Sequence, residues 1–215
     1  MNKKHIVLAT LLSISSFAVT AASDTAKLSL HRNNIKVWTY QTENNPIIQY
    51  KAETIYDVPL ERAVAVVLDV ERTPQWVPYV GKAQMLSRDD KKGEFTLYMV
   101  LDFPFPLKDR DLVVQGKMIR EANGQITIKN KAIQKGYPLN PDYVRLTHYE
   151  GDWTFNRLGE KKVKVSTYGY ANPEGSIPLT FVNMFVQQQP YQMLQKMKLE
   201  LNKSSTVPVL PEALR

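Results

Sequence analysis

The last third of the chain carries a pattern typical of one long helix, and this pattern limits what the rest can form. After the turn-forming run Asn172-Pro173-Glu174-Gly175, apolar residues recur at steps of three and four up to residue 201. Such spacing places them on one helix face. About 24 residues, each rising about 1.5 Å, give roughly 36 Å of helix, enough to cross a small domain. Pro190 lacks an N–H, so we expect a kink there.

The preceding sequence predicts mainly strands. Apolar and polar residues alternate in segments separated by turn signals, of which Asn123-Gly124 is a strong hairpin signal. A helix is expected over residues 60–70, with Asp57 as its N-cap and Pro59 in its first turn. Residues 24–34 predict a short helix or a loose arm, and residues 204–215 predict a loose tail. The expected strands are residues 35–43, 47–56, 82–88, 94–102, 110–121, 125–134, 144–155 and 161–171.

This order of elements predicts an α+β fold, in which helices cover one face of a curved antiparallel sheet. Strand parity predicts which side chains face the long helix. Parity leaves open whether that interior is filled or hollow. The inward side chains on the central strands include Leu97, Met99, Leu101, Leu112, Val114, Ile126, Ile128, Val163 and Val165.

The N-terminus has the composition of a secretory signal peptide. A short basic start is followed by an uncharged apolar run and small residues, which predicts a signal peptide over residues 1–21 with cleavage after Ala21 or Ala22. An uncleaved membrane anchor is the alternative, although the apolar run is short for a bilayer. We therefore expect a periplasmic protein. Removing residues 1–21 lowers the formal net charge from +7 to +5, and the scattered charges argue against a nucleic-acid partner.

Three motifs together resemble a known family. They are FPFPLKDRD at residues 103–111, DWTF at residues 152–155 and GSIP at residues 175–178, and they follow Trp76, which comes after the first long helix. In this order and spacing they resemble the START domain, the lipid-transfer family related to steroidogenic acute regulatory protein. The resemblance covers about residues 35–203, within a single expected domain over residues 22–203.

The resemblance implies a helix-grip fold, in which the sheet wraps the C-terminal helix around an internal hydrophobic tunnel. It implies non-catalytic binding and transfer of one lipid or other hydrophobic molecule, with the helix as part of a lid. The implied partners are this molecule and, transiently, a membrane surface, and we expect a monomer. Combined with strand parity, it gives these ligand-binding candidates: Trp76, Met99, Leu101, Arg110, Leu112, Val114, His148, Tyr149, Phe181, Val182 and Phe185.

The lipid class is left open by the resemblance. In family members that carry phosphatidylcholine, the choline cage uses aromatic residues at positions that correspond here to Met99, Leu112 and Tyr149. Only Tyr149 is aromatic, and a cation needs several ring faces. The resemblance therefore implies a lipid without specifying which one.

Several residues have two interpretations. Arg110 is predicted either to meet a lipid head group or, as we favour, to form a buried salt bridge with Asp102 or Asp109. His148 is predicted either as a polar pocket contact or general base, or more simply as a strand histidine. An enzyme using His148, Asp102 and Arg110 on a hydrophobic substrate is the alternative function, and a fully packed interaction module is a third. Cysteine is absent and no metal-binding histidine spacing occurs, so no cofactor or metal is expected.

Overall fold

One antiparallel sheet dominates the protein. The computed structural model describes residues 26–42, 45–175, 177–178, 181 and 184–215, so the predicted signal peptide lies outside the described residues. The strand order is β1-β2-β3-β10-β9-β7-β6-β5-β4, and β8 pairs in parallel with the start of β6. The strands are β1 Lys27–Arg32, β2 Ile35–Thr42, β3 Asn45–Tyr56, β4 Val80–Asp89, β5 Glu94–Leu101, β6 Arg110–Arg120, β7 Ile126–Ile133, β8 Val144–Arg145, β9 Tyr149–Gly159 and β10 Lys162–Ala171.

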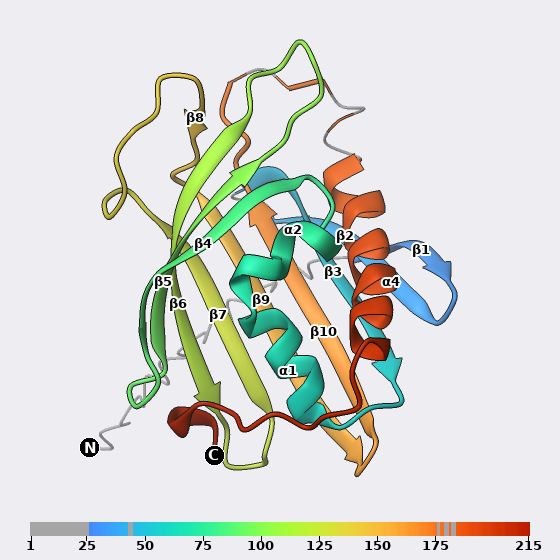
Figure 1. Ribbon diagram of the computed structural model, residues 1–215. Coiled ribbons are helices and arrows are strands. Elements are labelled where there is room, and N and C mark those ends of the chain that lie inside the picture. The colour runs from blue at the N-terminus through green and yellow to red at the C-terminus, as the bar shows by residue number, and fades with distance from the viewer. Residues whose placement is uncertain (1–25, 43–44, 176, 179–180, 182–183) are drawn as a thin grey trace, which may run out of the picture.

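The helices lie on one face of this sheet (Figure 1). They are α1 Leu60–Leu68, η1 Val70–Arg72, α2 Thr73–Trp76, the π-helical turn η2 Met184–Gln188, α4 Gln189–Asn202 and the short η3 Glu212–Leu214. The predicted α+β helix-grip architecture is therefore confirmed. Within the described residues, no helix is both long enough and apolar enough to cross a membrane.

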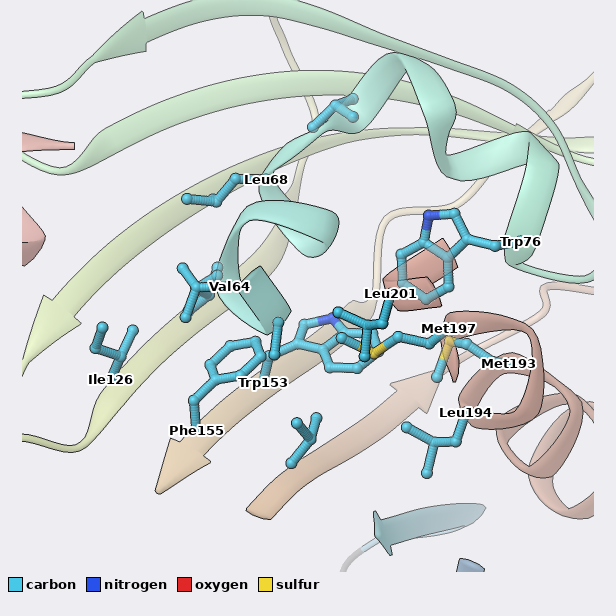
Figure 2. Close-up of a cluster of buried hydrophobic side chains, with 14 of the residues drawn as sticks. Val64, Leu68, Trp76, Ile126, Trp153, Phe155, Met193, Leu194, Met197 and Leu201 are labelled. Atoms are coloured by element: carbon cyan, nitrogen blue, oxygen red, sulfur yellow. The ribbon is translucent and has the colours of Figure 1, made fainter. Parts of the chain in front are cut away.

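The space between the sheet and helices α1 and α4 is filled by packed side chains. Figure 2 shows Val64 and Leu68 of α1 converging with Phe155 of β9 and with Leu194 and Met197 of α4. Phe155, Val64, Leu194 and Met197 have no measurable exposure to solvent. This packed half anchors α1 and α4 on the sheet, because buried side chains interdigitate at near-crystalline density.

The C-terminal helix is irregular at the predicted position. Pro190 lies in the first turn of α4, directly after the π-helical turn η2. Because proline has no N–H, it cannot bond to the carbonyl four residues earlier, and widened turns are one way in which a helix absorbs such a break. The helix is thus formed by two differently wound segments.

Three local predictions were wrong. Residues 27–32 form strand β1, which pairs with β2 at the sheet edge, where a leading helix or loose arm was expected. The strand expected over residues 144–155 is two strands, β8 and β9, separated by residues 146–148. Helix α1 begins after Pro59, and no side chain caps it, so Asp57 is not its N-cap.

The C-terminal tail is also more ordered than predicted. Leu210 and Leu214 are buried in the main core, and the Ala213 N–H donates to the Asp90 carbonyl at 2.8 Å. The Arg120 guanidinium donates to the Leu214 carbonyl at 2.9 Å. The prediction of a loose tail is therefore wrong for residues 210–215.

Candidate functional site

An apolar cavity of about 480 Å³ lies between the inner face of the sheet and helices α2, η2 and α4. Its sheet side is formed by alternating residues of β5 and β6, and its helix side by aromatic and aliphatic residues. None of the described lining side chains carries a charge. The principal apolar residues are Leu97, Met99, Leu101, Leu112, Val114, Trp76, Phe185, Val186 and Met193.

Three glycines in one line across the sheet help to make this space. Strand register places Gly116 of β6 opposite Asn130 of β7, and Gly151 of β9 opposite Gly169 of β10. The Asn130 amide joins the two pairs, because its Nδ2 donates to the Gly151 carbonyl at 2.5 Å. We call Gly116, Asn130, Gly151 and Gly169 the transverse row.

Each glycine of the transverse row is covered by an aromatic side chain. A Cβ added to Gly116 would lie 2.0 Å from the Phe95 ring, and one added to Gly169 would lie 2.1 Å from the Tyr50 ring. A Cβ on Gly151 would lie 2.1 Å from the Tyr149 hydroxyl. Glycine in a strand often marks such a close approach. The rings can therefore lie close against the sheet, which leaves room for the cavity above them.

The polar groups of the cavity wall are neutral. Burial raises the pKa of Tyr50 to about 12, and a hydrogen bond with Thr167 partly offsets this rise. Burial also raises the pKa of Tyr149, and the nearby Tyr50 adds to the effect. Both phenols therefore remain protonated at neutral pH. The Oδ1 atom of Asn130 is buried and has no hydrogen-bond partner among the described residues.

An aromatic cluster borders one end of the cavity. Phe185 of η2 stacks on Phe103, with ring centroids 4.7 Å apart, and meets Tyr79 edge-on at 5.2 Å. Tyr79 comes from the turn before β4, and Phe103 from the connection between β5 and β6. We call Tyr79, Phe103 and Phe185 the aromatic cluster. It joins three segments that are far apart in the sequence.

Arg110 supports this end of the cavity without lining it. Its guanidinium lies 4.2 Å from the centroid of the Phe103 ring and donates to the carbonyls of Pro173, at 3.2 Å, and Glu174, at 3.3 Å. It also donates to the Lys108 carbonyl. Burial lowers the pKa of Arg110. The predicted salt bridge with Asp102 or Asp109 is not formed, and backbone carbonyls take its place.

Glu174 is held firmly in the segment that leads to η2. Its backbone has a φ of 55°, which is unusual for a residue other than glycine. The Thr147 hydroxyl donates to Glu174 Oε1 at 3.2 Å, and His148 Nδ1 lies 3.5 Å from the same oxygen. Together with Arg110, these contacts fix residues 172–175 against the start of β6.

The structure brings most of the ligand-binding candidates together around the cavity. Seven of them line the cavity: Trp76, Met99, Leu101, Leu112, Val114, Tyr149 and Phe185. Arg110 lies behind the aromatic cluster, and Phe181 is half-buried but does not line the cavity. Val182 lies outside the described residues. The His148 side chain is 65% exposed and lies between β8 and β9, so it is not a strand histidine.

The residue set of the alternative enzyme is not assembled in the cavity. Asp102, Arg110 and His148 are absent from the described lining residues. Among the described residues, no group of histidine and acidic side chains has the proximity needed to hold a metal ion. The arrangement supports binding of an apolar molecule more than acid–base chemistry.

Sequence reasoning missed Tyr50, Phe103 and the transverse row. The three glycines each lie in a strand and share the inward parity of their neighbours, which was the available signal. Their alignment depends on the register between strands, and no single segment reveals that register. Phe103 was noted only as part of a turn motif.

The comparisons with known proteins agree with this geometry. A family model described as the START domain matches residues 23–205. The chain belongs to the START domain family. A solved structure of a START member, the STAR-related lipid transfer protein of Xanthomonas axonopodis, superposes with a TM-score of 0.76 and 27% identity, covering 84% of this chain and 100% of that one.

Two curated START proteins are also similar to this chain. Human StAR-related lipid transfer protein 7 is 23% identical over 191 residues, which is 85% of this chain and 51% of the human protein. The chain thus spans about half the length of this relative. Bovine phosphatidylcholine transfer protein is 25% identical over 162 residues, covering 73% of this chain and 75% of the bovine protein.

Proposed function

We propose that this START protein binds a lipid in its cavity and transfers it between membrane surfaces without chemical change. The observation that carries the proposal is the apolar cavity of about 480 Å³, whose described lining has no charged side chain. Each methylene that leaves water for such a space contributes about 0.8 kcal/mol. The names of the similar proteins, two lipid transfer proteins and a phosphatidylcholine transfer protein, support the same function.

Entry and release, in this proposal, occur at the aromatic cluster. Phe185 belongs to η2, and a π-helical turn before Pro190 is a natural place for the helix to bend. Displacing η2 separates Phe185 from Tyr79 and Phe103, while Arg110 keeps residues 172–175 tied to β6. The packed half around Leu194 and Met197 stays in place. The lid is therefore the first part of the C-terminal helix.

The proposed location is the periplasm, where lipids must cross an aqueous space between two membranes. The N-terminal signal-peptide pattern supports it. The mildly basic mature chain favours brief contact with anionic membrane surfaces.

The test of lipid binding is a substitution that fills part of the cavity with one larger side chain. Met99 faces the cavity and is half-buried, so Met99→Trp puts added volume into the ligand space. Extra side-chain volume in the space that the lipid fills costs about 1–3 kcal/mol. We therefore expect the amount of co-purifying lipid to fall about tenfold or more. Native mass spectrometry and solvent extraction of the purified protein measure it. Movement of pyrene-labelled lipids from donor to acceptor vesicles measures transfer.

Thr96→Trp is the matched control, because Thr96 lies on the same strand with the opposite parity. It should keep the lipid content and the transfer rate of the wild type. The enzyme hypothesis would replace the carrier proposal if the wild-type protein carries no lipid, takes none up from vesicles and turns over a hydrophobic substrate.

A further inference from the structure

The polar end of the bound molecule has no charged partner in the cavity. The described lining contains none, and two charged residues at the start of β6 are engaged elsewhere. Arg110 donates to three backbone carbonyls, and Asp111 pairs with Arg145 on the outer face of the sheet. Burying an ion without a partner is expensive, so the cavity disfavours a charged head group.

Two tyrosine hydroxyls nevertheless converge inside this apolar space. Gly151 and Gly169 are direct cross-strand partners, so their inward positions are about 5 Å apart. The Tyr149 hydroxyl lies 2.1 Å from the Cβ position of Gly151, and the Tyr50 hydroxyl lies 2.6 Å from that of Gly169. One small polar group of a ligand can therefore contact both phenols.

The two hydroxyls differ in what they already bind. Tyr50 interacts with Thr167, whose side chain is buried on the neighbouring strand β10. The Tyr149 hydroxyl makes no hydrogen bond with any residue in the described part of the chain. It is a neutral group that can both donate and accept. An unpartnered hydroxyl that lines an apolar cavity is best satisfied by a neutral donor and acceptor such as an alcohol.

The cavity volume limits the rest of the molecule. A cavity of about 480 Å³ lies within the range of about 300–1,000 Å³ that is usual for small-molecule sites. One amphiphile with a small head group fits a cavity of this size.

We propose that the resident ligand is an uncharged amphiphile whose hydroxyl end lies against Tyr50 and Tyr149. Its apolar part runs along the apolar wall formed by Met99, Leu112 and Val114. This inference rests on the proposed lipid-binding function and specifies its ligand class.

The test compares three probes that differ only in the head group. They are 1-dodecanol, tridecanoate at pH 8 and dodecyltrimethylammonium, each with a twelve-carbon alkyl chain, titrated into delipidated full-length protein by calorimetry. Because the chains match, their apolar contribution to binding is the same. We expect 1-dodecanol to bind at least about tenfold more tightly than either ion, since only the ions lose solvation without gaining a partner.

A single-atom change tests the position of the hydroxyl end. Tyr149→Phe should weaken 1-dodecanol binding about fivefold, the ratio expected for one hydrogen bond. Tyr98→Phe is the matched control, because the Tyr98 hydroxyl donates to Asp111 at 3.0 Å in the outer-face cluster. It should leave the affinity for 1-dodecanol unchanged.

The outcomes separate the two proposals. Equal or tighter binding of either ion, or unchanged affinity in Tyr149→Phe, overturns the neutral-amphiphile inference while leaving a lipid carrier intact. Failure of all three probes to bind, together with a wild-type protein that carries no extractable lipid, overturns the proposed function itself.

Discussion

A buried ion pair on the outer face of the sheet holds the strands behind the cavity. Asp111 is only 1% exposed, and its carboxylate accepts hydrogen bonds from Arg145 Nε at 2.8 Å and Nη2 at 2.9 Å. The Tyr98 hydroxyl donates to the same carboxylate at 3.0 Å. Burial, together with this hydrogen bond, raises the pKa of Tyr98, while the hydrogen bond to Asp111 raises the pKa of Arg145. The pair links β6 to β8.

Asp111→Asn should lower the free energy of unfolding by about 3–5 kcal/mol, because it leaves the Arg145 guanidinium buried without a counter-charge. Tyr98→Phe removes a single hydrogen bond and should cost only about 1 kcal/mol. Urea unfolding followed by circular dichroism measures both. Equal losses in the two variants would show that the ion pair contributes no more than the tyrosine bond.

Arg110 shows what parity can and cannot predict for a single residue. Strand parity correctly separated Arg110 from Asp111, which occupy different clusters in the structure. The partner of Arg110 could not be predicted, because the carbonyls of Pro173 and Glu174 lie more than 60 residues away in the sequence. Tertiary contacts of this kind leave no local signal.

Among the elements, the C-terminal segment has a larger role than its sequence suggests. Residues 204–215 contain two prolines and show no periodicity, so the sequence gives no sign of burial there. Leu210 and Leu214 are nevertheless buried beside β6 and the turn after β4. Strand β1 was missed for a related reason. It is an edge strand whose residues are half-buried or exposed, so its alternation is weak. The central strands were predicted well because one face of each is mainly apolar.

Leu214→Ala should lower the free energy of unfolding by about 2–5 kcal/mol, since Leu214 has no measurable exposure and its loss leaves a void in the core. Leu199→Ala is the matched control on α4, where the side chain is 62% exposed, and it should change stability by no more than about 0.5 kcal/mol. Chemical unfolding of both variants decides the matter. Similar, small losses would mean that the end of the chain is not part of the cooperative fold.

At the scale of the whole molecule, the protein combines a packed half with a hollow one. A ligand that fills the hollow binds the folded chain and not the unfolded one, so it must stabilise the fold. At a free concentration of 100 times its Kd, 1-dodecanol should raise the free energy of unfolding of the wild type by about 2.7 kcal/mol. Thermal and urea unfolding with and without the alcohol measure the change.

Met99→Trp provides the control for this stabilisation, because its cavity is partly filled. At the same alcohol concentration its stability should rise by much less than that of the wild type. An equal rise in both proteins would place the bound alcohol outside the cavity.

The overall fold was predictable, and Figure 1 shows the expected helices on one face of the sheet. The alternation of Leu97, Met99 and Leu101 and the long C-terminal helix determine a sheet covered on one face. The cavity depends on how the strands are aligned, which brings Gly116, Gly151 and Gly169 into one line. The family resemblance predicted an internal tunnel, but the glycines that make room for the cavity emerge only from that alignment.

The transverse row reverses a common rule of protein engineering. Replacing glycine by alanine in a strand usually helps, because it restricts the unfolded chain. At Gly116, Gly151 and Gly169 the added methyl group would collide with Phe95, Tyr149 or Tyr50 and push an aromatic side chain into the ligand space. Substitution tables that score this exchange as conservative would therefore misrank these positions, and a substitution there should be read as a change in cavity volume.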